Sequence, residues 1–248
     1  MVSILGAASG GLEYGQALID TVGHNLANVN TFAFKRSRVL AEGIPGMPGQ
    51  TASPARSGIA ELTVDRIFSP GFAQATNDPL QFSITDDAFF RVRNVDGAVV
   101  MTRDGSLGTD GQGNVVSSAG LLLEPPISLP PGYSHPSIDV NGVVSAADAT
   151  GNKQSVGQIS LVRYKSPQTL LALGGGLYEE TVNSGLSVAG VPGDGTFAQI
   201  VPGSLEGSNV EVATEFANLL IAQRAYQASA KTFGVADTMQ AIAANLTK

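Results

Sequence analysis

The residues of this chain that could carry out chemistry are few, and their spacing forms no catalytic or metal-binding motif. Cysteine is absent, and the only two histidines are His24 and His135. Neither histidine has a second ligand at the spacing of a zinc site, and no G-x-S-x-G turn presents a nucleophilic serine. We therefore predict a protein that is not an enzyme and that holds no metal and no cofactor.

Three further clusters have simpler explanations. Asp86 and Asp87 are adjacent, and neighbouring residues of a strand point to opposite faces, so they would not share a substrate. Residues 104–114 are rich in Asp, Gly and Asn but lack the ligand spacing and the closing Glu of a calcium loop. The three glycines at 174–176 are not followed by the Lys-Ser/Thr pair of a phosphate loop. Turns and solvated side chains account for these clusters.

The composition favours a folded, turn-rich chain. Of 248 residues, 43% are hydrophobic and 14% are charged, with 30 Gly and 13 Pro. The formal charge of −7, without any run of Lys or Arg, disfavours nucleic acid as a partner. No apolar stretch reaches the ~20 residues that span a bilayer. The first residues lack the basic segment of an ordinary secretory signal, so export would use a route without signal cleavage.

Two stripes of mostly apolar residues predict that the ends of the chain, which would position any site, are helices. Near the start, steps of three and four residues alternate through Leu5, Ala8, Leu12, Gly15, Ile19, Val22, Leu26 and Val29. Near the end, the same steps run through Ile221, Ala225, Ala228, Thr232, Val235, Met239 and Ile242. A heptad pattern of this kind turns one stripe of each helix toward a partner helix. We therefore expect the two ends to meet each other, other copies of the chain, or both.

Local signals predict where these helices begin and end. The first helix is expected from about Ser3 to Asn28, because Asn favours caps and turns. The last helix is expected to start at Ser208, because Ser208 and Glu211 fit the S-x-x-E capping box, and to end near Leu246.

Between the helices the sequence predicts a loop and then a β domain. Residues 40–57 are rich in Gly, Pro, Ala and Ser, which is typical of a loop. Asp-Gly and Asn-Gly pairs, which favour hairpin turns, separate runs rich in Val, Ile and Phe at 81–85, 88–94, 98–102, 115–117 and 158–165. The predicted fold is α+β, with long N- and C-terminal helices in a coiled-coil-like bundle and a central, mostly antiparallel β domain. The predicted parts are an N-terminal helical assembly segment 1–36, an extended segment 37–71, a β-rich domain 72–200 and a C-terminal helical assembly segment 201–248.

Several motifs, in order along the chain, resemble one family. Residues 25–31 (NLANVNT), followed by Phe34-Lys35-Arg36, resemble the N-terminal signature of bacterial flagellar rod and hook proteins. Residues 205–210 (LEGSNV) and 222–228 (AQRAYQA) resemble the C-terminal signature of the same family. The middle segments 87–92 (DAFFRV), 102–107 (TRDGSL), 125–127 (PPI) and 156–159 (VGQI) resemble most the distal rod members.

The resemblance implies a structural subunit of the rod, the drive shaft that crosses the periplasm and transmits torque from motor to hook. Such proteins pass through a dedicated type III export apparatus without a cleaved signal peptide and polymerise helically through their terminal helices. The implied partners are copies of the chain itself, other rod and hook proteins, the ring proteins of the basal body and the export apparatus, with no nucleic acid and no membrane span. The expected assembly interface comprises Leu5, Leu12, Ile19, Val22, Leu26, Asn28, Phe34, Lys35, Arg36, Phe216, Leu220, Ile221, Arg224, Ala225, Tyr226, Ala228, Val235, Met239 and Ile242.

Two features depart from the family pattern. The family has Gly where this chain has Ala33, and Ala is strained if the backbone there needs a positive φ angle. The stretch between Arg38 and Val64 is shorter than in typical distal rod members, which leaves a proximal rod protein or a short hook-type subunit as alternatives. A different class, a monomeric β-rich binding module whose end helices pair within one chain, is the main rival.

Two sets of charged side chains have alternative interpretations. The only basic cluster, Lys35, Arg36 and Arg38, forms either a solvated face or partners for carboxylates of a neighbouring copy, such as Glu211 or Glu215. Arg224 is either an exposed residue on a polar strip or a buried bond between subunits.

Overall fold

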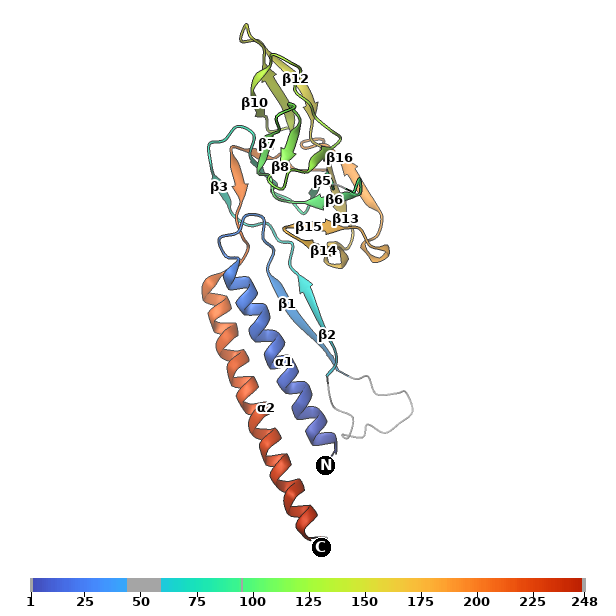
Figure 1. The fold of residues 1–248 in the computed structure, drawn as a ribbon, viewed down its shortest axis with the longest axis vertical. Helices are drawn as coiled ribbons and strands as arrows, with labels where there is room; N and C mark the ends of the chain where they lie inside the picture. Colours follow the sequence, from blue (N-terminus) through green and yellow to red (C-terminus); the bar gives the residue numbers. More distant parts are fainter. Residues whose placement is uncertain (1, 44–58, 95, 247–248) are drawn as a thin grey trace. The chain divides into compact units, whose positions relative to one another are not determined.

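A computed structural model describes residues 2–43, 59–94 and 96–246 of the chain (Figure 1). The chain forms two compact units. Unit 1 takes its described residues from 1–29, 36–67 and 210–248, and unit 2 takes its residues from 30–35 and 68–209. The two ends of the chain therefore belong to the same unit.

The described residues of unit 1 form two helices and a two-stranded sheet. Helix α1 (Val2–Ala27) and helix α2 (Val212–Leu246) lie side by side (Figure 1). Strands β1 (Ser37–Gly43) and β2 (Ile59–Arg66) pair antiparallel. Neither of the described helices is apolar over enough of its length to cross a bilayer.

The predicted coiled-coil-like bundle is wrong, because α1 and α2 form a single pair and are the only α-helices among the described residues. The two helices approach closely at a glycine of α1: a Cβ added at Gly15 would lie 3.1 Å from the Cβ of Tyr226 on α2. Helix α2 buries Ala222 completely, whereas the preceding residue, Ile221, is 63% exposed. The face that α2 turns toward the chain's own core is thus displaced by one residue, or ~100°, from the predicted stripe.

Two predicted boundaries also differ from the structure. Helix α2 begins at Val212, four positions after Ser208, where it was expected to start, so Glu211 is the residue that precedes the helix. The Glu211 carbonyl accepts the Glu215 N–H at 3.0 Å, and its carboxylate accepts the Thr214 hydroxyl at 2.8 Å. The loop predicted at 40–57 overlaps strand β1 in residues 40–43, and its remaining positions, 44–57, lie outside the described residues.

Unit 2 is built from short antiparallel strands. Its largest sheet follows the order β14-β15-β6-β5-β9-β8-β7, with β13 pairing with both β5 and β16, and a second sheet has the order β10-β11-β12. Two strand pairs, β17-β4 and β18-β3, complete the unit. The strands are β3 (Ala73–Ala75), β4 (Phe82–Ser83), β5 (Phe89–Arg93), β6 (Val99–Thr102), β7 (Leu107–Thr109), β8 (Val115–Ser117), β9 (Leu122–Glu124), β10 (Ser134–Ile138), β11 (Val143–Ala147), β12 (Lys153–Gln158), β13 (Leu161–Tyr164), β14 (Leu171–Gly174), β15 (Leu177–Glu179), β16 (Ser187–Gly190), β17 (Val201–Pro202) and β18 (Ser204–Glu206). Two 3₁₀ turns, η2 (Pro167–Thr169) and η3 (Val182–Ser184), lie between strands.

One turn design recurs in unit 2. In each case the carbonyl of an Asp accepts the N–H of a Gly three positions later, and the Asp N–H donates to the carbonyl of the residue after that Gly. The three Asp-Gly pairs are Asp110 with Gly113, Asp139 with Gly142, and Asp148 with Gly151. The glycine φ angles are 87°, 73° and 87°, values that side chains other than Gly rarely adopt.

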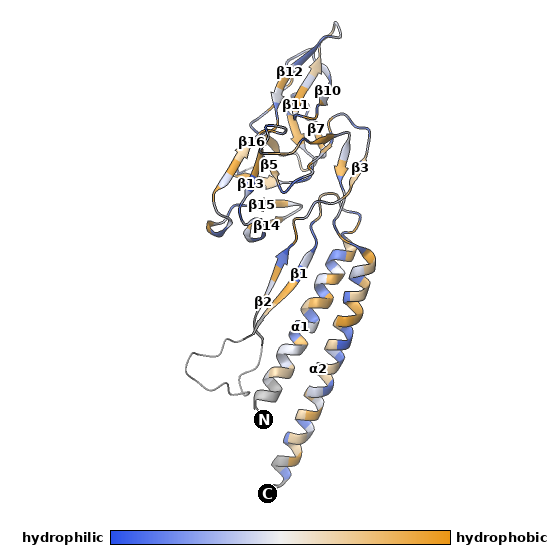
Figure 2. Ribbon diagram, turned by 180° about the vertical axis from the view of Figure 1, so that it is seen from behind, coloured by the Kyte–Doolittle hydropathy of each residue, from blue (hydrophilic) through white to orange (hydrophobic). Residues whose placement is uncertain are grey.

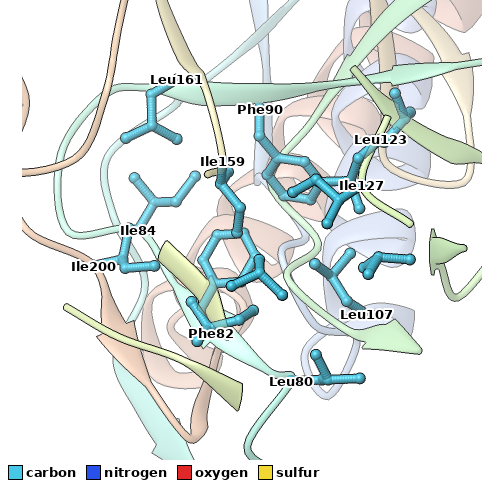
Figure 3. Close-up of a cluster of buried hydrophobic side chains, with 14 of the residues drawn as sticks. Leu80, Phe82, Ile84, Phe90, Leu107, Leu123, Ile127, Ile159, Leu161 and Ile200 are labelled. Carbon is cyan, nitrogen blue, oxygen red and sulfur yellow. The ribbon is translucent and has the colours of Figure 1, made fainter. Parts of the chain in front are cut away.

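The large sheet separates two hydrophobic cores. Phe89 and Phe90 are adjacent on β5 and both fully buried, and because strand neighbours point to opposite faces they enter different cores. The larger core surrounds Phe82 and Phe90, whose ring centroids lie 5.2 Å apart (Figure 3). The smaller core packs Phe89 edge-on against Phe68 and Tyr178.

Candidate assembly site

A buried carboxylate joins the two ends of unit 2. The side chain of Glu206, on β18, is 1% exposed and accepts hydrogen bonds from four donors. Lys35 Nζ lies 2.6 Å from Oε1, and the Gly71 N–H lies 2.9 Å from the same oxygen. Arg103 binds both oxygens, with Nε 2.9 Å from Oε2 and Nη2 3.0 Å from Oε1. This geometry satisfies the carboxylate and explains how it can be buried.

The two cations of this site are buried as well. The side chains of Lys35 and Arg103 are 0% exposed. Lys35 also donates to the Ser69 carbonyl at 2.9 Å, and Arg103 donates to the Ala88 carbonyl at 2.7 Å. Burial, followed by the charge of Arg103, lowers the pKa of Lys35 from 10.5 to about 8. Two cations around one carboxylate leave an excess positive charge, so losing the Lys35 proton would relieve it.

The backbone around Glu206 is held in place by close contacts. Ala33 has a φ angle of 55°, as its position in the signature suggested, and its N–H donates to the Glu206 carbonyl at 2.7 Å. The N–H of Asn209 donates to the Phe34 carbonyl at 3.4 Å. Any Cβ at Gly71 would clash with the carbonyl oxygen of Gly207. The N-terminal and C-terminal signatures are therefore bonded to each other within unit 2.

In unit 1 the first signature ties helix α1 to strand β1. The amide of Asn25, which is 1% exposed, donates to the Ser37 carbonyl and accepts the Ser37 N–H, both at 2.8 Å. The Asn28 side chain donates to the His24 carbonyl at 2.8 Å, close to the end of α1. The two Asn residues of the motif thus make different bonds: Asn25 bonds to strand β1, and Asn28 bonds to the end of helix α1.

The basic cluster finds its carboxylates within the same chain. Arg36 lies 3.6 Å from Glu215, and Arg38 lies 2.9 Å from Asp65. Within the single chain Arg36 therefore faces Glu215 of its own unit 1, and a contact of the basic cluster with a neighbouring copy stays a prediction. Lys35 belongs to the Glu206 site and is not part of a solvated basic face.

In the structure, the predicted interface residues occupy buried, half-buried and exposed positions. In the first group Leu5 lies in α1, Val22 and Lys35 are buried, and the half-buried members are Leu12, Ile19, Leu26, Asn28, Phe34 and Arg36. On α2, Ala225 is half-buried, and the exposed members are Phe216, Leu220, Ile221, Arg224, Tyr226, Ala228, Val235, Met239 and Ile242. Within this chain Arg224 therefore lies on the solvent side of the helix.

Five of the exposed apolar residues of α2 lie on one stripe along the helix. Ile221, Ala228, Val235, Met239 and Ile242 are separated by steps of seven, seven, four and three residues, which return to the same side of a helix. Ile221, Val235, Met239 and Ile242 are between 56% and 63% exposed. Hydrophobic positions recur along the whole of α2 (Figure 2). We call these five residues the α2 stripe.

The other side chains that were considered for chemistry make local contacts or are exposed. Asp86 pairs with Arg163 at 2.6 Å and accepts the Ala88 N–H, and Asp87 is exposed. His135 is exposed and lies 3.0 Å from the Ser134 hydroxyl. Within the described part of the chain, no three His, Asp or Glu side chains gather as metal ligands would. Sequence reasoning missed Asn25, Arg103 and Glu206 as structural centres, although all three lie inside the motifs quoted for the family.

Family models match two parts of the chain. The model described as flagellar hook protein FlgE/F/G D1 domain matches residues 83–146, and the model described as flagellar basal body rod FlgEFG protein C-terminal matches residues 201–246. The second match contains Glu206 and the α2 stripe. The family of rod proteins that these models describe is structural and has no enzymatic activity, which places the chain in a class of structural proteins.

Full-length relatives identify the family. The flagellar basal-body rod protein FlgG of Borreliella burgdorferi is 35% identical over 262 residues, which covers 99% of each chain. The FlgG protein of Bacillus subtilis is 33% identical over 96% of each chain. The rod protein FlgF of Caulobacter vibrioides is 31% identical over 86% of this chain and 84% of its own length. The chain belongs to the flagellar basal-body rod protein family and is a structural component of the flagellar basal body.

Proposed function

We propose that this chain polymerises helically with copies of itself to form part of the flagellar rod, and that the polymer transmits torque from the motor to the hook. The α2 stripe is the observation that carries the proposal. Its four large apolar side chains are more than half exposed in the single chain. A stripe of this kind gains free energy when a partner covers it, at roughly 25 cal/mol per Å² of apolar surface.

Within the family we propose a distal rod member. The relatives named FlgG align over nearly the whole chain, whereas the FlgF relative covers 86% of it. This chain would then work in the periplasmic part of the basal body and reach it through the flagellar export apparatus without losing a signal peptide. Its partners would be further copies of itself, other rod and hook proteins and the surrounding ring proteins.

The Glu206 site would make unit 2 of such a subunit rigid. It fixes the two signatures of unit 2 to each other through buried charges, which salt screens much less than exposed ones. A subunit that transmits torque has to resist deformation, and a fully bonded, buried site would provide that resistance within unit 2.

Polymer formation by the full-length chain tests the proposal. We expect the purified chain to form filaments as its concentration rises, seen by electron microscopy. Met239→Glu places a charge on the α2 stripe and should abolish them, whereas Gln227→Glu, at an exposed position off the stripe, should leave them. Far-UV circular dichroism checks that both variants keep their helices.

A parent chain that stays monomeric at every concentration would refute the proposal and favour the rival, a binding module whose helices pair only within one chain. Filaments that form equally well with Met239→Glu would remove the α2 stripe from the interface.

A further inference from the structure

A hollow in unit 1 lies where α1, α2 and β1 converge. Its volume is about 260 Å³. The apolar side chains on its wall include Leu18 and Val22 of α1, Val39 of β1 and Ile221 of α2, and Thr21 of α1 also lines it. A cavity of roughly 150 Å³ is large enough to hold benzene, so this hollow has room for a large aliphatic side chain.

Two arginines that form ion pairs in unit 1, Arg36 and Arg38, stand beside this hollow. Arg36, Arg38 and Glu215 contribute to its lining, so the apolar wall is bordered by charge. An apolar floor with a charged edge is the usual composition of a site that receives an apolar side chain from another protein surface.

The other end of the helix pair offers a side chain of the right kind. Helix α2 runs on past the beginning of α1 (Figure 1). Near its end, Met239 and Ile242 are 57% and 60% exposed and lie three positions apart on one side of the helix. Residues 234–246, the α2 tail, contain one charged side chain, Asp237, whose sign is opposite to that of the arginines at the hollow.

The α2 tail cannot fill the hollow of its own chain. Ile221, on the wall of the hollow, and Ile242 lie 21 positions apart on one continuous helix. At 1.5 Å per residue this separation is about 32 Å. Only a different copy of the chain can bring the tail of α2 to this wall.

We propose that the hollow is a socket for the α2 tail of a second copy, with Ile242 or Met239 of one copy seated beside Thr21 of the next. The inference rests on the proposed polymerisation and specifies one of its contacts. A socket at one end of the helix pair and a tail at the other form a head-to-tail contact, and such a contact builds an open filament when its rotation does not close a ring.

The absence of cysteine makes this contact directly measurable, because any disulfide must come from introduced residues. One preparation carries Thr21→Cys and a second carries Ile242→Cys. They are mixed, polymerised as full-length chains and treated with a mild oxidant. Filaments should then yield covalent dimers joined between the two variants, since a disulfide needs Cα atoms about 4.4–6.8 Å apart.

A matched pair replaces Ile242→Cys with Gln227→Cys, at a position that is also exposed but off the α2 stripe. We expect about tenfold less dimer from that pair, because only held thiols react at a high effective concentration. Filaments that give no more dimer with Ile242→Cys than with Gln227→Cys would overturn the socket and leave the proposed polymerisation standing. A parent chain without filaments would overturn both.

A second variant covers the case in which cysteine chains fail to polymerise. Thr21→Trp fills the hollow and should stop filament growth while far-UV circular dichroism stays unchanged, and Thr21→Ser should grow like the parent. Normal filaments from Thr21→Trp would contradict the socket.

Discussion

Lys35 and Glu206 lie 171 positions apart in the sequence, yet the Lys35 ammonium donates to the Glu206 carboxylate at 2.6 Å in a buried site. The contact closes unit 2 around the chain's two signatures. Among the described residues, Glu206 is the only carboxylate bonded to both Lys35 and Arg103, so its loss would leave two buried cations without the counter-ion that they share.

Glu206→Gln should therefore destabilise unit 2 strongly. Removing one member of a buried ion pair costs about 3–5 kcal/mol, because the remaining charge stays desolvated. Hydrogen exchange of the β5 and β6 amides measures the effect, since both strands belong to unit 2 and β6 ends beside Arg103. Glu124→Gln is the control: its partner Arg93 is 48% exposed, and a surface pair contributes about 0–1 kcal/mol. Equal effects of the two substitutions would contradict the central role of Glu206.

The lowered pKa of Lys35 predicts a pH dependence of stability. Its pKa is about 8 in the folded chain and 10.5 when the residue is free, so between these values the unfolded chain binds more protons. The free energy of unfolding should then rise with pH in this window, and this contribution should be lost again as the pH falls toward 8. Lys35→Met removes the titrating group, so the difference between the parent and this variant should depend on pH from 8 to 10.5. A pH-independent difference would show that Lys35 keeps its usual pKa.

The positive φ angle of Ala33 predicts how substitutions at this position change the stability of unit 2. At a φ angle of 55° a residue with a Cβ is strained by roughly 1–2 kcal/mol, and a β-branched residue is strained further. Ala33→Val should therefore lower the thermal midpoint of unit 2. Ala33→Gly relieves strain but loses a methyl group that is 3% exposed, so it should remain within about 1 kcal/mol of the parent. Scanning calorimetry distinguishes the two, and a Val variant as stable as the parent would refute the strained turn.

The local elements of this fold could be predicted because each depends on neighbouring residues. The first helix was expected from Ser3 to Asn28 and lies at Val2–Ala27, and the run at 115–117 forms β8. These predictions need only apolar spacing and turn residues. The positive φ angle at Ala33 was also suggested by a local comparison, the Gly that the family signature has at this position.

The features that could not be predicted depend on contacts between residues that are far apart in the sequence. A heptad stripe predicts a buried face but does not say whether the chain itself or another copy buries it. In this chain Ala222 is buried, whereas Ile221, on the predicted stripe, is 63% exposed. The Glu206 site joins segments from three parts of the chain, and nothing around Lys35, Arg103 or Glu206 marks them as partners. The helix start was misplaced because the S-x-x-E pattern of Ser208 and Glu211 lies in the extended segment that precedes α2.

Asn25 should be the most sensitive position of the first signature. Its side chain satisfies both the N–H and the carbonyl of Ser37, a residue that is 6% exposed, so Asn25→Ala leaves two buried polar groups without partners. Each such group costs about 1–3 kcal/mol, and we expect unit 1 to lose about 2–4 kcal/mol. Asn28→Ala, which removes a bond at the half-exposed end of α1, should cost about 1 kcal/mol or less. Hydrogen exchange at Ser37 and its neighbours in β1 reads out the difference, because the Ser37 amide has its acceptor on Asn25 and becomes unprotected when that side chain is cut back. Comparable losses from the two alanine variants would mean that the helix end, and not the bond to the strand, fixes the signature in unit 1.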